Sequence, residues 1–329
     1  MDELKAQCNF PYQTFKVHYL GGYSRAFARG LNKLIRKNNP EFVFVPEFSI
    51  IALQVIILRW VFGYKYKIIS LCDDSYDMIQ GNDFSRVHRY SRKLIVPFVD
   101  NLILNNAKSC KWYQENYHKG VYFPIITDER VFRHKVEASL PLAAKLQEQY
   151  QLSHRKIILY VGRLMELKRI DDLLHAFRLV KEDAVLVVIG SGAEEQRLKA
   201  LDAVLDTHAI FLEWKVGQEL FAWYALADVL VLPSRQEAFG AVVNEGLISG
   251  CLCVVSDKCG SETLVTPSVN GFIFKSLDIA DLSEKIGLAL DKVSKSSSLT
   301  LKPNMMPFSF DQMLCDIAKN LNLFENRCL

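Results

Sequence analysis

The chain has 329 residues, of which 50% are hydrophobic, 11% aromatic and 23% charged, with a net charge of +3. This composition excludes a disordered chain, a collagen-like repeat and a lone small module, and the length predicts two domains of ordinary size. The eight cysteines form no CxxC pair, and no histidine lies at zinc spacing, so we expect no disulfide framework and a cytoplasmic location. No apolar segment follows Met1, and the longest apolar run, residues 50–58, is too short to span a bilayer, so neither a secretory signal nor a transmembrane segment is expected.

Positive charge is concentrated in the first half of the chain. Residues 1–125 contain 17 Lys and Arg against 10 Asp and Glu, whereas residues 126–329 contain 23 against 27. Such an asymmetry indicates a half that meets an anionic surface or ligand, although solubility alone also explains an excess of this size.

The first half predicts a small α/β domain. Short apolar segments predict strands at residues 15–20, 42–45, 67–71 and 101–104. Amphipathic segments predict helices near residues 24–37, 49–61, 83–96 and 108–117. Residues 126–150 are mixed and charged, and we place the interdomain connection inside them.

The second half alternates apolar and amphipathic segments more regularly. Continuous apolar runs predict strands covered on both faces, at residues 157–161, 184–189, 210–212, 229–232, 251–255 and 272–274. Helices are predicted at residues 170–180, 194–205, 218–227, 241–248 and 279–290, and a polar linker at 294–298 precedes a last helix over 311–321. The pattern is that of a doubly wound α/β domain with a parallel sheet.

Three segments carry the candidate chemistry, each after a predicted strand. Gly162 and Arg163 are followed by Lys168, and two cations beyond the carboxyl end of a strand suit a diphosphate, although two surface cations are an equal alternative. Gly190 opens a Gly-Ser-Gly turn that lets backbone approach a ligand, or simply joins a strand to a helix.

The third segment, residues 232–246, is the most informative. Glu237 lies in a loop and Glu245 in the helix that follows, whose first amides and positive dipole end suit anionic or hydroxyl-rich ligands. A carboxylate accepts both hydrogen bonds of a vicinal diol, so two acids eight residues apart can hold two sugars. Taken singly, each glutamate is more commonly explained as a capping or solvated acid.

Residues 156–290 resemble the nucleotide-binding domain of retaining GT-B glycosyltransferases of family 4, the glycosyl transferases group 1. The resemblance includes the three segments above, with Glu-Ala-Phe-Gly at the first glutamate, and further single residues: Pro233, Ser234, Gly250, Ser256, Asn270 and Gly271. It implies two Rossmann-like doubly wound domains that face a cleft. Residues 1–130 would bind the acceptor, residues 131–308 would bind the nucleotide sugar, and residues 309–329 would form a helix that packs back on the first domain.

The resemblance also assigns roles to residues. Arg163 and Lys168 would bind the donor diphosphate and Glu245 the nucleotide ribose, while Glu237 would contact the transferred sugar; Glu237, Arg163 and Lys168 are the catalytic candidates. The other predicted donor-binding residues are Gly162, Gly190, Trp214, Lys215, Val216, Ala238, Phe239, Gly240 and Ala241. Of these, residues 214–216 would border the base.

The first domain departs from the family. The family begins with a strand and a Gly-rich loop that faces the donor phosphates, whereas this chain starts later, so we expect a reduced N-terminal domain in which Gly21 and Gly22 form a simple turn. The family's histidine after the strand at 67–71 is replaced by Cys72. Asp73 and Asp74 follow it and, together with His88, are the acceptor-binding candidates; loop caps and a structural histidine are the alternatives.

Two predicted helices carry a basic face, formed by Arg25, Arg29, Lys33 and Arg36 in the first and by Arg86, Arg89, Arg92 and Lys93 in the second. Basic amphipathic helices lie on anionic lipid in some proteins, although a solvated face over a packed one is the commoner explanation. Together with a family that often acts on lipid-linked glycans, they suggest peripheral contact with the inner face of a membrane. No motif that reads nucleic acid is recognisable.

We therefore expect a glycosyltransferase that moves a hexose-type sugar with retention from a UDP- or GDP-sugar to a glycan or lipid-linked acceptor in cell-surface polysaccharide biosynthesis. No Asp-x-Asp occurs, so transfer is expected to need neither a metal nor another cofactor. One alternative is a non-catalytic sugar-nucleotide-binding protein, or a subunit completed by a partner. A nicotinamide oxidoreductase is a third reading, against which the missing third glycine of the dinucleotide fingerprint argues.

Overall fold

The computed structural model describes residues 17–19, 26–81, 84–294 and 299–323. The chain divides into two compact units: the first takes in the chain up to Asp73, residues 82–104 and residues 111–121. The second holds residues 122–329 and two short segments, 74–81 and 105–110. Gly21, Gly22, Arg25 and residues 295–298 of the predicted linker lie outside the described residues.

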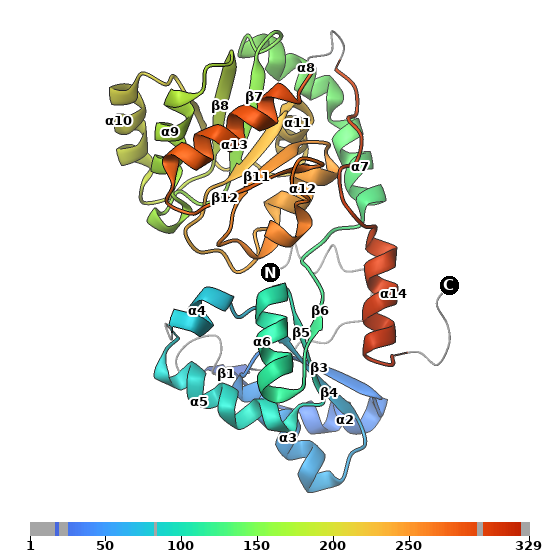
Figure 1. Cartoon of the computed structure of the whole chain (residues 1–329). Helices are drawn as coiled ribbons and strands as arrows, with labels where there is room; N and C mark the ends of the chain where they lie inside the picture. Colours follow the sequence, from blue (N-terminus) through green and yellow to red (C-terminus); the bar gives the residue numbers. More distant parts are fainter. Residues whose placement is uncertain (1–16, 20–25, 82–83, 295–298, 324–329) are drawn as a thin grey trace. The chain divides into compact units, whose positions relative to one another are not determined.

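The second unit is built on a six-stranded sheet that the sequence predicts closely (Figure 1). Every pairing in it is parallel, and the order is β12-β11-β10-β7-β8-β9. The strands are β7 (Lys156–Val161), β8 (Ala184–Ile189), β9 (Ile210–Leu212), β10 (Val229–Leu232), β11 (Leu252–Ser256) and β12 (Gly271–Phe274). The chain builds outward from β7 to β9 on one side and then returns to β10 on the other, so the strand order reverses between β7 and β10.

Helices cover both faces of this sheet, and the alternation along β7 shows why (Figure 1). Ile157, Leu159 and Val161 join one buried cluster, with α7 (Glu129–Ala138), α8 (Leu140–Gln149), α11 (Gly217–Leu226) and α12 (Val242–Ile248). Ile158 and Tyr160 join the other, with α9 (Ile170–Leu179), α10 (Glu195–Leu205) and α13 (Ile279–Asp291). A strand buried on both faces needs apolar residues at every position, which is why the strands here are continuous apolar runs.

The remaining elements of the second unit are short or lie at its ends. The segment 126–150, where we placed the interdomain connection, forms the two helices α7 and α8. The last helix is confirmed as α14 (Phe310–Asn320), and its first turn contacts α7: the Phe310 amide donates to Glu129 Oε2 at 3.0 Å. The short helices are η3 (Glu166–Lys168), η4 (Gly260–Leu264) and α4 (Tyr76–Gly81).

The first unit contains a smaller sheet, ordered β3-β4-β5-β6, in which β3, β4 and β5 pair in parallel, and an antiparallel pair, β1 with β2. Its strands are β1 (Val17–Tyr19), β2 (Ala26–Ala28), β3 (Phe42–Pro46), β4 (Lys67–Cys72), β5 (Asn101–Leu104) and β6 (Val121–Tyr122). Its helices are α2 (Leu31–Asn38), α3 (Ile50–Phe62), α5 (Arg86–Ile95), η2 (Val96–Phe98) and α6 (Ala107–Tyr117), of which α6 begins in the second unit.

The helix predicted near residues 24–37 is wrong over its first part. Residues 26–28 form β2 instead, with Ala26 and Ala28 buried and Phe27 exposed, the period of two that a strand requires. The side chain of Gln54 on α3 completes this strand, because its amide accepts from the Ala28 N–H and donates to the Ala28 carbonyl. Gly30, at φ +82°, then turns the chain into α2.

The two basic faces are therefore smaller than predicted. Arg29 lies before α2, so only Lys33 and Arg36 of the first set belong to that helix. On α5, Arg92 is 8% exposed, and its guanidinium lies 5.6 Å from the ring centre of Phe84 and 5.1 Å from that of Trp112. Its charge therefore packs on aromatic rings and is not part of a surface stripe.

Candidate functional site

The predicted donor residues gather where the strand order of the second unit reverses. The loops after β7 and β10 both lie at the carboxyl edge of the sheet, where ligands bind in open α/β folds. The backbone joins them, since the Arg235 amide donates to the Leu167 carbonyl at 2.9 Å. The arrangement follows from strand order, because β7 and β10 are neighbours although 67 residues lie between them.

Glycines permit the close approach of the turns after β7 and β8. A Cβ on Gly190 would lie 1.8 Å from the Gly162 carbonyl oxygen, and one on Gly192 would lie 2.1 Å from that of Leu164. The Gly162 amide donates to Ile189, and the Leu164 amide donates to Ser191. The glycines at 190 and 192 thus have a packing reason in this fold, and the role of Gly190 and Gly162 at a ligand stays a prediction.

The ammonium group of Lys168 is bonded directly to the carboxylate of Glu237. Lys168 ends η3, Glu237 lies in the loop after β10, and the two side chains are only 15% and 19% exposed. Each therefore compensates the other's charge where solvent screens it only in part. The lysine predicted to hold a phosphate and the glutamate predicted to hold a sugar form one unit.

Arg163 completes the cationic side of this region. Its side chain is exposed, and it has no ion-pair partner among the described residues. Its carbonyl accepts a hydrogen bond at 3.0 Å from the hydroxyl of Tyr160. Burial raises the pKa of Tyr160 far above its ordinary range, so this hydroxyl stays protonated and keeps donating. The backbone is thus anchored while the guanidinium is available to an anion.

The loop from Glu237 to Ala241 is held in one conformation by its neighbours. Gly240 has φ +97°, and a Cβ there would lie 2.4 Å from Leu232 Cδ2, so a larger residue is excluded on both counts. Among the described residues, no acceptor is found for the amides of Gly240 and Ala241. These two half-buried donors are suited to oxygen atoms of a ligand.

Glu245 lies one turn further on, in α12, and is held by a tyrosine. The hydroxyl of Tyr224 on α11 donates to Glu245 Oε2 at 2.5 Å. Burial raises the pKa of Glu245 above its ordinary value, and the hydrogen bond from Tyr224 opposes that shift. Tyr224 was not predicted from the sequence, because nothing in a helix of apolar and aromatic residues shows which ring reaches a residue 21 positions away.

The loop predicted to border a nucleotide base follows β9, the outermost strand on this side of the sheet. Trp214 and Val216 are 54% and 66% exposed, and Lys215 pairs with Glu219 at 3.3 Å. The amide of Gly190 donates to Leu212, which sets this loop beside the turn after β8. An exposed tryptophan at the carboxyl edge of the sheet offers a flat surface to an aromatic ligand.

The three acceptor candidates do not form a cluster in either unit. Asp73 is exposed at the end of β4, in the first unit. Asp74 belongs to the second unit and is buried, with its carbonyl accepting from the Ser109 hydroxyl at 2.6 Å. The ring of His88 stacks on that of Phe84, with 4.3 Å between the ring centres, and lies edge-on to that of Phe48, with 5.5 Å between the ring centres. Their binding role stays a prediction.

Neither a cluster of candidate metal ligands nor a membrane-spanning helix occurs in the part of the chain that the structure describes. No group of three or more His, Cys, Asp or Glu side chains in this part of the chain is arranged to hold a metal ion. None of the helices that the structure describes combines the length and apolarity that a membrane span requires.

Comparison with known proteins identifies the class. Residues 144–300 match the family described as Glycosyl transferases group 1. An uncharacterized glycosyltransferase of Methanocaldococcus jannaschii, MJ1607, is 38% identical over 120 residues, which are 35% of this chain and 31% of that protein. The D-inositol 3-phosphate glycosyltransferase of Corynebacterium efficiens is 23% identical over 313 residues, 85% of this chain and 70% of the relative.

Solved structures are similar in fold to most of the chain. The crystal structure of Anabaena Alr3699/HepE in complex with UDP superposes with a TM-score of 0.73 at 16% identity, covering 90% of this chain and 83% of that one. Residues 144–300 are thus similar to the glycosyl transferases group 1 family, and the chain has the GT-B fold of two Rossmann-like domains. The predictions of family and fold class are confirmed.

Proposed function

We propose that this protein transfers a hexose-type sugar from a nucleotide-diphosphate donor, a UDP- or GDP-sugar, to a glycan or a lipid-linked acceptor. The observation that carries the proposal is the contact of Lys168 with Glu237 at the point where the strand order reverses. One ligand that presents a diphosphate to the lysine and sugar hydroxyls to the glutamate satisfies both groups. The Anabaena protein was crystallised in complex with UDP, which supports a uridine donor.

The proposed donor-binding residues contact different parts of the nucleotide sugar. Arg163 and Lys168 bind the diphosphate, Glu245 accepts hydrogen bonds from the ribose hydroxyls, and Trp214 lies against the base. Glu237 and the amides of Gly240 and Ala241 bind the transferred sugar. Each assignment rests on charge and on hydrogen-bonding capacity, because carboxylates accept from diols and an arginine fork matches phosphate oxygens.

The proposed reaction retains configuration and needs no metal. As the bond between the anomeric carbon and the diphosphate oxygen breaks, negative charge grows on the leaving diphosphate, and the two cations stabilise it. The acceptor oxygen bonds to the oxocarbenium-like carbon on the same face, and its proton passes to the departing diphosphate. We assign no enzymatic nucleophile to this step.

A donor screen tests the proposal. The full chain is incubated with UDP- and GDP-sugars and a set of glycan, lipid-linked and inositol-phosphate acceptors, with and without EDTA, and release of free nucleotide is measured. We expect release with one donor class that is unchanged by EDTA. Tight binding of a sugar nucleotide without any release would establish the non-catalytic alternative, and loss of release in EDTA would contradict the metal-independent mechanism.

The first unit is proposed to contact an anionic membrane, and α3 is the element that supports this. Ile57, Trp60 and Val61 lie on one helical face and are 51%, 81% and 68% exposed, and the exposed cations Lys65 and Lys67 follow the helix. Aromatic and aliphatic side chains beside lysines suit the boundary of anionic lipid. The proposed surface differs from the one that the sequence predicts, which is the basic faces of two other helices.

Removal of apolar surface from α3 is expected to weaken binding to vesicles. Trp60→Ser with Val61→Ser should lower the affinity for phosphatidylglycerol vesicles about tenfold or more, because both side chains lose burial in the interface. Sedimentation with vesicles measures it. Val204→Ser provides the control, since Val204 is also 81% exposed but lies on α10 of the other unit. Equal binding by all three proteins would count against the assignment.

A further inference from the structure

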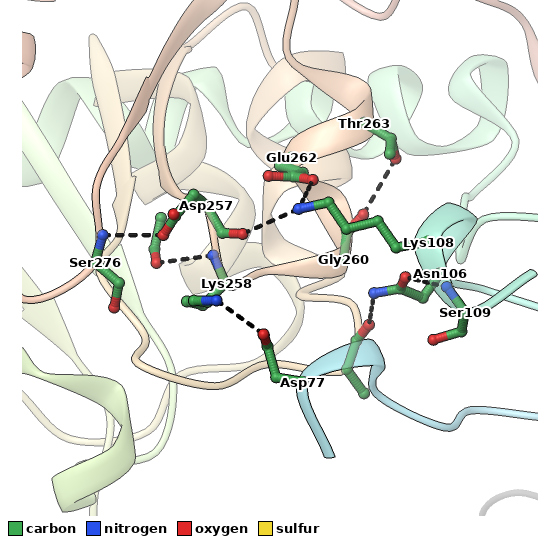
Figure 2. Close-up of polar contacts among 12 residues, drawn as sticks. Asp77, Asn106, Lys108, Ser109, Asp257, Lys258, Gly260, Glu262, Thr263 and Ser276 are labelled. Carbon is green, nitrogen blue, oxygen red and sulfur yellow. Dashed lines mark hydrogen bonds and ion pairs between the residues drawn. The ribbon is translucent and has the colours of Figure 1, made fainter. Parts of the chain in front are cut away.

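A group of polar contacts outside the donor residues joins three segments of the second unit (Figure 2). Lys258 Nζ lies 2.8 Å from Asp77 Oδ1 on α4, and Lys108 Nζ on α6 lies 2.5 Å from Glu262 Oε1 on η4. Asp77 and Lys108 thus pair with Lys258 and Glu262 of the segment 257–262, so that each of these two sets holds one cation and one anion. We call these four residues, Asp77, Lys108, Lys258 and Glu262, the charge clasp.

Asn106 lies beside the charge clasp and makes two hydrogen bonds in opposite directions (Figure 2). Its Oδ1 accepts from the Ser109 amide at 3.0 Å, which caps α6, and its Nδ2 donates to the carbonyl of Ala238 at 3.4 Å. The side chain is buried. A Cβ on Gly260 would lie 2.9 Å from this Nδ2 and 2.1 Å from the Ala238 oxygen, so the three residues are in close contact.

The segment 257–262 is hydrogen-bonded to the loop from Glu237 to Ala241. The Glu237 amide donates to Lys258 at 3.2 Å, the Gly260 amide donates to Glu237 at 3.2 Å, and the Ser261 amide donates to Phe239 at 2.8 Å. A short parallel bridge also pairs Glu237 with Cys259. The backbone of Glu237 is therefore hydrogen-bonded to the segment 257–262, which holds two residues of the charge clasp. The carbonyl of Ala238 accepts a hydrogen bond from the side chain of Asn106.

We propose that Asn106 and the charge clasp are positioning elements for the loop from Glu237 to Ala241. This inference rests on the proposed function for its catalytic consequence. Arg163, Lys168 and Glu245, which are proposed to hold the diphosphate and the ribose, lie on backbone outside the loop, and among the described residues only Lys168 of the three contacts a side chain of the loop, that of Glu237. Displacement of the loop thus lowers the rate of sugar transfer and leaves nucleotide affinity nearly unchanged, because a small misplacement of a group at the reacting centre acts on turnover.

The first experiment separates the two hydrogen bonds of Asn106. Asn106→Asp and Asn106→Ser both keep a good helix cap and remove the donor to Ala238. Hydrogen–deuterium exchange of the free protein is expected to be about three- to tenfold faster in both variants at the amides of Glu237, Gly260 and Ser261, whose hydrogen bonds join the loop to the segment 257–262, as the loss of one hydrogen bond implies. Unchanged exchange at these amides, or faster exchange throughout the second unit, would overturn the proposal.

The second experiment reverses charges. Lys258→Glu and Asp77→Lys each place like charges together, whereas the double variant restores an opposite pair in the swapped orientation. Exchange in the loop should rise in each single variant and return toward the original value in the double variant. Lys199→Glu is the control, because it breaks the exposed ion pair with Glu195 on α10 and should leave the loop unaffected.

Kinetics with the donor found in the screen complete the test. The Asn106 and single clasp variants should lose several-fold in kcat with UDP or GDP affinity, measured by calorimetry, within twofold of the original. An equal loss in nucleotide affinity would overturn the positioning role. If the unaltered protein turns over no donor, the proposed function fails, and the exchange measurements still decide whether the loop is positioned in this way.

Discussion

Replacement of Lys168 by methionine is expected to lower kcat/KM for the donor by about two to three orders of magnitude, the range found when one group that stabilises a developing anion is removed. The lysine supplies a charge that is only 15% exposed and lies against Glu237. Methionine keeps most of the chain length and removes the charge. Steady-state kinetics with the donor identified by the screen measure the loss.

The substitution has a second effect that must be separated from the first. Without Lys168, the carboxylate of Glu237 is left with little solvent and no ion-pair partner among the described residues, which we expect to lower the free energy of unfolding by about 1–3 kcal/mol. Lys168→Met with Glu237→Gln should recover much of that stability but not the activity. Arg163→Ala, at an exposed residue, should slow transfer without a loss of stability.

Lys199→Met is the matched control for the lysine. It removes one exposed ion pair on α10 and should change neither activity nor unfolding by more than a small amount. If Lys168→Met retained full kcat/KM while melting at a lower temperature, Lys168 would be a structural partner of Glu237 and the assignment to the diphosphate would be wrong.

Glu245→Gln is expected to weaken UDP or GDP binding by about 2 kcal/mol, roughly thirtyfold, because a neutral amide accepts hydrogen bonds from ribose hydroxyls more weakly than a carboxylate does. In the unaltered protein the affinity should fall as pH falls through the pKa of Glu245. Burial raises this pKa, so the loss begins at a higher pH than an ordinary glutamate would give. Calorimetric titration over a pH series measures both effects.

Tyr224→Phe tests the cause of that pH dependence. The hydroxyl of Tyr224 lowers the pKa of Glu245 against the larger effect of burial, so its removal should raise the pKa further and move the loss of affinity to still higher pH. Tyr66→Phe is the control: it also removes a buried hydroxyl, bonded at 2.8 Å to the Val55 carbonyl, but in the first unit. A pH profile unchanged by Tyr224→Phe would show that the tyrosine does not set the ionisation of Glu245.

The extent to which the sequence predicts this structure differs between the two halves for a physical reason. The second-unit strands are continuous apolar runs, which a sheet buried on both faces requires, and their predicted bounds agree with the structure within a residue or two. In the first unit, the segment at residues 26–28 has the composition of a helix start. It is a strand because it pairs with β1 and is completed by Gln54, and neither contact is visible locally.

The candidate site shows the same limit. The sequence indicates which residues carry charge, and it predicts that the loops after β7 and β10 lie at one edge of the sheet. It does not show that Lys168 contacts Glu237 or that Tyr224 contacts Glu245, because these contacts depend on strand order and helix rotation. Arg92 is the opposite case, since its spacing suggested a surface charge and the aromatic rings of Phe84 and Trp112 enclose it.

The ion pair between Lys168 and Glu237 bears on how such an enzyme would discriminate among small anions. Inorganic phosphate must separate the ammonium group of Lys168 from the carboxylate of Glu237, and it has no sugar hydroxyl groups that could donate to that carboxylate instead. An intact sugar nucleotide compensates both partners, because its hydroxyls reach the carboxylate as its phosphates reach the ammonium. After transfer, the nucleoside diphosphate has lost the sugar that engaged Glu237, so re-formation of the pair favours departure of the product.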